Sequence, residues 1–189
     1  MRTRILFGLS ILVALPACAQ PDSMARQLDE VARVATVMVD GDVCQRIVTP
    51  RAMKYMLKVD PRDRWLGSDN FDVNHEAYIQ TKKTLLRLAR LASFPCDVNL
   101  WMPLQTDPPK IQIVIRNTNE MSQFWPWGTL YQDMIPQMKT VLETGRRMTV
   151  QDKPGWISVL APVYNSLGDV VGVVEAVSRL ERDARENVK

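Results

Sequence analysis

The sequence predicts an α+β domain in which helices come first and a five-stranded antiparallel sheet follows, with one helix between strands two and three. Apolar residues recur at helical spacing before Cys96, and from there the spacing changes to two, which is typical of strands. The stretch ISVLAPVYNSLGDVVGVVEAVS, residues 157–178, has the form of two strands around a tight turn. Long N-terminal helices packed on one side of such a sheet form a layered α+β architecture.

Residues 1–19 have the pattern of a signal peptide. Arg2 and Arg4 precede an apolar run of 11 residues, 5–15. This run is too short to cross a bilayer core of roughly 30 Å but has the length of the apolar part of an export signal. The pattern therefore predicts an exported protein.

Two ways of processing this signal remain open. Ala17-Cys18-Ala19 is a small-residue cleavage site, with cleavage before Gln20. The four residues ending at Cys18, LPAC, resemble a bacterial lipobox, in which the cysteine is lipidated and becomes the mature N-terminus. The domain is expected in the periplasm in the first case and lipid-anchored in the cell envelope in the second, so Cys18 is the only membrane attachment we expect.

The composition is that of a globular domain, with 46% hydrophobic and 24% charged residues. The net charge is +3, but two of the 24 basic residues belong to the leader, and 22 then stand against 21 acidic residues. This near neutrality lacks the basic surplus of a nucleic-acid-binding protein. We therefore expect no nucleic-acid partner.

Cys44 and Cys96 are the two cysteines that follow the leader. In an oxidising compartment two such cysteines most simply form a disulfide. Because 52 residues separate them, closing this loop would stabilise the fold by about 4 kcal/mol in the chain-entropy model. The alternative is a reactive thiol, which needs a base, and the chain has one His, His75.

Residues 20–95 are expected to form the helical part of the domain. Asp22 or Ser23 can cap a first helix that runs to about Val39, with Gly41 ending it. Five apolar residues repeat along one side of it at spacings of four and three: Met24, Leu28, Val31, Ala35 and Met38.

Two further helices are expected before the sheet. The first covers about 50–59, and a loop over 61–70 follows it. The second is capped by Asp72 or Asn74 and runs to about Ala92. Its basic residues lie away from its apolar side, as expected for a solvated face.

Residues 96–189 are expected to form the sheet. The predicted strands are approximately 98–102, 111–116, 147–151, 156–164 and 170–178. A loop over 117–129 leads into a helix that ends at about 144. Its regular part should begin near Asp133, because Pro136 fits only the first turn of a helix. Gly145 supplies the left-handed residue that ends it.

Four segments between about Asp97 and Leu180 stand out together: DVNLWMPL, KIQIVIRN, VLETGRR and GWISVLAPVYNSLGDVVGVVEAVS. They resemble the Cache family, the extracellular PAS-like sensor domains of bacteria, and the long N-terminal helix fits the same family. Typical members continue into a membrane helix and a kinase or chemotaxis module. This chain has neither, so the resemblance implies a free-standing member that is secreted or lipid-anchored.

The resemblance also implies a ligand cavity on one face of the sheet, closed by the loop and helix after the second strand. Aromatic residues gather in that loop, and further candidates lie on strands that can line the cavity. The candidate ligand-binding residues are Trp101, Arg116, Trp125, Trp127, Tyr131 and Tyr164. Aromatic walls with one Arg suit an amino acid or a small carboxylate. The alternative is that these aromatic residues are ordinary core.

Motifs of catalysis and metal binding are not recognisable in the chain. The sequence has no G-x-S-x-G, Walker A or G-x-G-x-x-G motif. His75-Glu76 begins like H-E-x-x-H, but Ile79 stands where the second His is required. We therefore expect no enzyme, no metal and no cofactor, and His75 as a haem ligand stays as an alternative.

These observations predict an exported, non-enzymatic Cache-like domain of the bacterial cell envelope. It is expected to bind a small ligand, an amino acid or a carboxylate, and to serve a partner sensor protein in the envelope. Two alternatives remain: a scaffold or interaction module with a filled core and no ligand, and a haem-binding PAS-like sensor.

Overall fold

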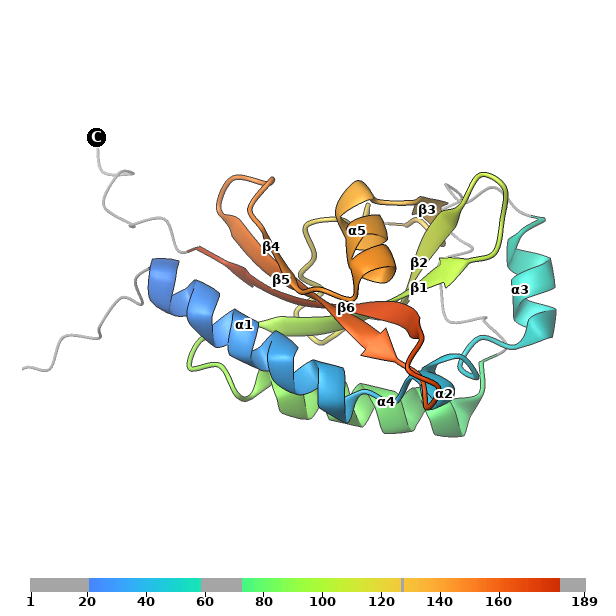
Figure 1. Ribbon diagram of the computed structural model, residues 1–189, viewed down its shortest axis with the longest axis horizontal. Coiled ribbons are helices and arrows are strands. Elements are labelled where there is room, and N and C mark those ends of the chain that lie inside the picture. The colour runs from blue at the N-terminus through green and yellow to red at the C-terminus, as the bar shows by residue number, and fades with distance from the viewer. Residues whose placement is uncertain (1–20, 59–72, 127, 181–189) are drawn as a thin grey trace, which may run out of the picture.

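The computed structural model describes residues 21–58, 73–126 and 128–180. It is an α+β domain built on one antiparallel sheet in the order β3-β2-β1-β6-β5-β4 (Figure 1). The strands are β1 (Asp97–Leu104), β2 (Lys110–Ile115), β3 (Gln132–Asp133), β4 (Met148–Val150), β5 (Trp156–Tyr164) and β6 (Val170–Arg179). The helices are α1 (Pro21–Met38), α2 (Gly41–Cys44), α3 (Pro50–Met56), α4 (His75–Ala89) and α5 (Pro136–Thr144). The signal peptide with Cys18, the expected loop over 61–70 and Trp127 lie outside the described residues.

The hairpin formed by β5 and β6 lies in the middle of the sheet. β6 pairs with β5 from Trp156↔Arg179 to Tyr164↔Val170, and its other edge pairs with β1. Both strands therefore have two neighbours, since β4 covers the far side of β5. The hairpin predicted from the sequence completes the centre of the sheet.

The sheet has six strands where the sequence predicted five. The additional strand, β3, has two residues and pairs with the edge strand β2, with Asp133 opposite Lys110. These residues were expected at the start of a helix. The helix begins only at Pro136, which occupies its first turn, and it ends at Gly145 with φ 64°. Since proline lacks the N–H that a helix interior requires, the chain before it stays extended and pairs with β2.

Gly41 does not simply end the first helix but begins α2. Asp40 caps this short helix by accepting a hydrogen bond from the Val43 N–H at 3.1 Å. A Cβ at Gly41 would lie 2.4 Å from the carbonyl oxygen of Tyr164. Only glycine therefore allows the chain after α1 to pack directly on the end of β5.

Helices cover both faces of the sheet, whereas the sequence predicted them on one side. Alternate residues of β1, β5 and β6 point to opposite faces. The helix face packs under α1, α2 and α4, and its residues are Val98, Leu100, Ile157, Val159, Ala161, Val163, Val174 and Ala176. The loop face packs under α5 and the segment 116–131, and its residues are Asp97, Asn99, Trp101, Ser158, Leu160, Val173 and Glu175.

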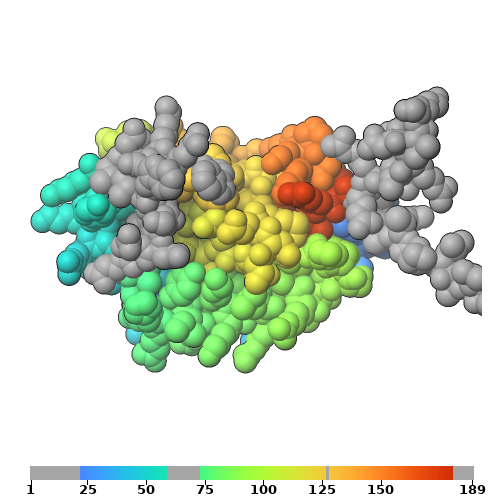
Figure 2. Space-filling model, turned by 180° about the vertical axis from the view of Figure 1, so that it is seen from behind, coloured from blue at the N-terminus to red at the C-terminus, as the bar shows by residue number. Residues whose placement is uncertain are grey.

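The segment 116–131, of which Trp127 is not described, forms part of the surface. Seen from behind, it (yellow) lies between α4 (green) and the turn that joins β4 to β5 (orange) (Figure 2). In the ranges 21–58, 73–126 and 128–180, no helix has the length and apolar character needed to cross a membrane.

Candidate functional site

A fully buried carboxylate, that of Glu175, lies at the centre of the loop face. Both of its oxygens accept hydrogen bonds, and the donors come from two strands and the segment after β2. Oε2 accepts from Ser122 Oγ at 2.7 Å, Trp101 Nε1 at 3.0 Å and Asn99 Nδ2 at 3.4 Å, and Oε1 accepts from Gln123 N and Ser158 Oγ, both at 3.0 Å. Because such a charge is costly to bury without partners, these donors make its position possible.

Two opposing effects act on the pKa of Glu175. Burial raises it, because the charged form loses its hydration, and hydrogen bonds from Gln123, Ser122, Trp101 and Ser158 lower it. Burial is the larger effect, so the pKa of this carboxyl lies above the ordinary value of 4.5. Among the described residues, no charged neighbour contributes to the shift.

Asp97 holds the first half of the segment 116–131 against the sheet. Its carboxylate accepts hydrogen bonds from Met121 N at 2.8 Å and from Asn119 Nδ2 at 2.8 Å. Asn99 adds two more, accepting from Asn117 N at 3.1 Å and donating to Met121 O at 2.7 Å. The buried polar residues of the loop face thus fix an irregular segment whose described residues pair with no strand.

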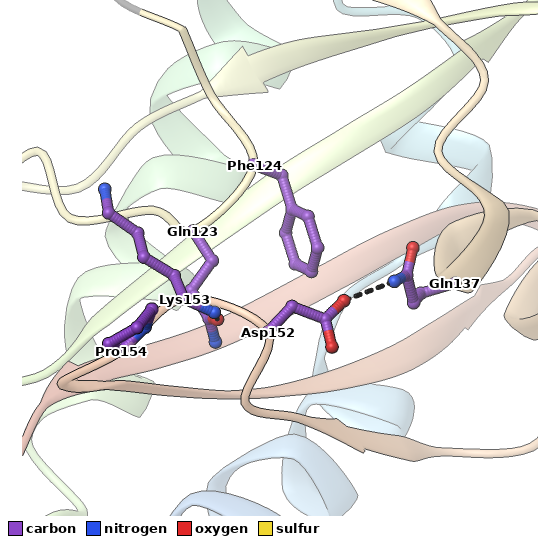
Figure 3. A pocket seen from close by; sticks show the side chains of 6 residues that line it. All are labelled: Gln123, Phe124, Gln137, Asp152, Lys153 and Pro154. Carbon is purple, nitrogen blue, oxygen red and sulfur yellow. Dashed lines mark hydrogen bonds between the residues drawn. The ribbon is translucent and has the colours of Figure 1, made fainter.

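An open hollow of ≈ 470 Å³ lies beside this fixed segment (Figure 3). Its walls come from the segment after β2, the first turn of α5 and the β4–β5 turn. The lining residues are Gln123, Phe124, Gln137, Asp152, Lys153 and Pro154. The ring of Phe124 points into it, and the side chains of Asp152 and Gln137 meet across it in a hydrogen bond (Figure 3). The rim therefore combines an apolar surface with charges of both signs.

Gln123 joins the hollow to the buried carboxylate. Its Nε2 donates to Val150 O at 2.9 Å and to Ser158 Oγ at 2.8 Å, while its Oε1 accepts from Lys153 N at 3.2 Å. Its own backbone N–H donates to Glu175. One residue thus forms part of the wall, holds the β4–β5 turn in place and contacts the centre of the sheet.

The structure brings three of the candidate ligand-binding residues together on one side of the loop face. Trp101 is fully buried beneath α5. Trp125 packs at the edge of the same cluster, and the guanidinium of Arg116 lies 4.1 Å from the centre of its ring. Arg116 also pairs with Glu120 at 3.5 Å. These residues stabilise the segment 116–131.

The other two described candidates lie elsewhere. Tyr131 is buried against Met56, Leu104 and Leu130. The hydroxyl of Tyr164 donates to the carbonyl oxygen of Gly145 at 2.9 Å and fastens the end of α5 to β5. Trp127 lies outside the described residues.

Buried side chains lie between the sheet and α5, on the face where the resemblance to Cache domains implied a cavity. The buried residues there are Trp101, Ile111, Met138, Val141, Val150, Leu160 and Val173. The hollow lies at the side of this cluster, and none of its lining residues was a candidate from the sequence. The sequence does mark the buried carboxylate that Gln123 contacts, because Glu175 is the single charged residue in the apolar run VVGVVEAV.

The predicted disulfide is absent, because Cys44 and Cys96 are both free and buried. Cys96 Sγ donates to Ala89 O at 3.3 Å, while a side-chain hydrogen bond links Cys44 to Thr81. Thr81 and Ala89 stand eight residues apart on α4, about 12 Å along its axis, whereas bridged cysteines need Cα atoms within about 7 Å of each other. Burial raises the pKa of each thiol to about 12, which does not favour a reactive thiolate.

His75, the alternative haem ligand, is exposed in the first turn of α4. Within the part of the chain that the structure describes, no group of three or more His, Cys, Asp or Glu side chains could hold a metal ion.

No family model matches the chain, and no curated protein matches it. Solved structures do match, among them the crystal structure of the A. Aeolicus nlh2 GAF domain in an inactive state. The alignment covers 70% of this chain and 80% of that domain, at 8% sequence identity and a TM-score of 0.35. A match at this TM-score transfers no function.

Proposed function

We propose that this chain is an exported Cache-like sensor domain of the bacterial cell envelope that binds a small zwitterion, an amino acid, without transforming it. The observation that carries the proposal is the hollow, which presents an acidic and a basic residue beside an aromatic ring. Its volume of ≈ 470 Å³ lies within the range of small-molecule sites, about 300–1,000 Å³.

Each part of an amino acid has a matching group at this rim. The carboxylate of Asp152 suits the ammonium group, and the ammonium of Lys153 suits the carboxylate. The ring of Phe124 offers an apolar surface to the side chain. Lys153 Nζ lies 4.5 Å from the centre of the Trp156 ring, so reaching a ligand exchanges a cation–π contact for an ion pair.

The position of Gln123 suggests how binding is passed to the sheet. A ligand that orders the β4–β5 turn acts on the hydrogen bonds between Gln123, Val150 and Lys153. The same residue contacts Glu175 on β6, which is bonded to both β1 and β5. An envelope partner that reads this domain would then sense the ligand through the central strands.

A thermal-stability screen of the exported protein against amino acids and small carboxylates tests the proposal. A ligand present at 100 times its Kd stabilises the native state by about 2.7 kcal/mol and raises the melting temperature. Asp152→Asn and Lys153→Gln should each remove this shift. Lys139→Gln is the matched control, since Lys139 is an exposed lysine on α5 outside the hollow that pairs with Glu143. A shift that survives both site variants, or disappears equally in the control, contradicts the site.

A second function, a scaffold or interaction module without a ligand, is favoured by a different observation. Leu167 in the β5–β6 turn is 85% exposed and Val37 near the end of α1 is 79% exposed. A hydrogen bond from Ser166 N to Asp42 Oδ2 at 2.9 Å holds that turn against α2, which follows α1. A flat ligand screen, together with loss of a crosslinked envelope partner in Leu167→Ser, would favour this function over the first.

A further inference from the structure

One end of the molecule brings together the beginning of α1 and the beginning of β5. Gly41, just after α1, packs on Tyr164, the last residue of β5. Asp29, in the first half of α1, forms an ion pair with Arg147 at 3.0 Å. Met148, which follows Arg147 and begins β4, pairs with Leu160 in the middle of β5. α1 therefore runs alongside β5 in the same direction, and its first turn lies where β5 starts (Figure 1).

At this end two cations lie against one aromatic ring. Trp156, the first residue of β5, pairs with Arg179 near the end of β6. The Arg179 guanidinium lies 4.6 Å and Lys153 Nζ 4.5 Å from the centre of the indole ring. Trp156 is half-buried, while both basic residues are exposed. We call these three residues the Trp156 edge.

Tryptophan flanked by Lys and Arg is the composition of a protein surface at a membrane interface. The indole has an apolar body and a polar N–H and prefers the level of the lipid headgroups. Basic side chains beside it are attracted to the phosphates of anionic lipids. The Trp156 edge has this chemistry.

We propose that the Trp156 edge lies against an anionic lipid surface and orients the domain there. The inference rests on the envelope location in the proposed function. Cys18 precedes Pro21 by three residues, which span at most about 11 Å when extended. A lipid on Cys18 would therefore place the membrane beside the first turn of α1, at the end of the molecule that carries this edge.

The strength of the contact fits orientation rather than attachment. Each Lys or Arg near an anionic membrane strengthens the binding of the protein to that membrane about five-fold. The edge has two such residues. Asp22 in the first turn of α1 and Asp152 beside Lys153 oppose them. A lipid chain supplies the attachment, and the edge selects which side of the domain meets the surface.

The test attaches the mature protein to vesicles at its N-terminus and measures tryptophan quenching by lipids brominated close to the headgroup. A hexahistidine tag immediately before Gln20 and a nickel-chelating lipid supply the attachment, so the result does not depend on how Cys18 is processed. We expect quenching in phosphatidylcholine vesicles that contain phosphatidylglycerol. Most of it should be lost in Trp156→Phe and retained in the matched control Trp125→Phe. Equal quenching in wild type and Trp156→Phe would overturn the proposal.

Arg179→Gln provides the charge test and keeps it separate from ligand binding. Arg179 belongs to the edge but not to the hollow. The variant should reduce quenching several-fold in anionic vesicles and leave any amino-acid thermal shift unchanged. Added salt should also reduce quenching in anionic vesicles, because it screens the attraction between the cations and the lipids. Quenching that is equal in pure phosphatidylcholine and insensitive to Arg179→Gln would also overturn the proposal, whereas a flat ligand screen bears only on the hollow.

Discussion

The two faces of the central sheet are held by different physical means. The helix face consists of aliphatic side chains under α1, α2 and α4, whose contacts are non-directional. The loop face combines a smaller apolar cluster under α5 with buried Asp97, Asn99, Ser158 and Glu175, whose hydrogen bonds must be met group by group. An amphipathic helix can cover a sheet by burying a stripe of side chains, but an irregular segment also brings backbone N–H groups that need acceptors. The difference explains why the acidic residues lie on the face that carries the candidate site.

The largest effect is expected from Glu175→Leu on the loop face. Leucine fills a similar space but removes the acceptor of the donors from Trp101, Gln123 and Ser122. We expect unfolding to become easier by about 3–5 kcal/mol, because each buried donor left without an acceptor costs about 1–3 kcal/mol. Urea denaturation measures the change. Glu143→Leu on the exposed side of α5 is the control and should change stability by less than about 0.5 kcal/mol. A wild-type midpoint in Glu175→Leu would show that apolar contact alone holds the loop face.

Leu28→Ala tests the helix face. Leu28 is fully buried on α1, and removing its side chain should cost about 3 kcal/mol through lost burial and the cavity left behind. Leu28→Met conserves volume and should cost less than about 1.5 kcal/mol. The same urea midpoints compare the two variants. If methionine were as damaging as alanine, the helix face would depend on geometry as strongly as the loop face.

The pH dependence of stability should separate the two faces by a smaller effect. The pKa of Glu175 is raised in the folded protein above 4.5, the ordinary carboxyl value. At a pH between 4.5 and the raised folded pKa, the folded state holds one more proton at this carboxyl than the unfolded state. The contribution of Glu175 to the unfolding free energy is therefore complete below pH 4.5 and falls as the pH rises through its folded pKa.

Urea midpoints measured over a pH series check this dependence. The loss should be missing from the pH profile of Glu175→Gln, whose amide does not titrate, and present in that of Leu28→Ala. A profile that is identical in wild type and Glu175→Gln would contradict the assignment of the shift to Glu175.

The smallest effect is expected from a reducing agent. Cys44 and Cys96 are free, so dithiothreitol should leave the melting temperature unchanged, whereas a disulfide between them would contribute about 4 kcal/mol. Both thiols should react with a maleimide only after denaturation, because burial protects them and raises their pKa to about 12. Denatured, unreduced protein that fails to label at these positions would restore the disulfide.

Local patterns predicted most of the elements. The strands β5 and β6, the helices α1 and α4 and the turn at Gly145 are close to their expected bounds, since periodicity and caps act over a few neighbouring residues. The short strand β3 was missed because its two residues become a strand only by pairing with β2. The covering of both sheet faces by helices was not predicted. The strands β1, β5 and β6 carry buried residues on both sides, and their sequences do not say which element covers each face.

The candidate site could not be predicted in the same way. Gln123, Gln137 and Asp152 lie in different segments, and each is an ordinary polar residue when seen alone. The aromatic candidates Trp101 and Tyr131 are buried in the apolar clusters. An aromatic side chain signals a large contact area, and sequence alone does not distinguish a core contact from a ligand contact.

The sequence by itself determined the helical first half, the change to strand spacing at Cys96 and the terminal hairpin, because propensity, capping and side-chain alternation are local. The tertiary structure decided where the hairpin sits, which face each alternate residue covers and that Cys44 and Cys96 stay apart. It also decided that Glu175 meets donors from β1, β5 and the segment after β2. These features depend on contacts between residues far apart in the chain, and their energies exist only when all the partners are in place.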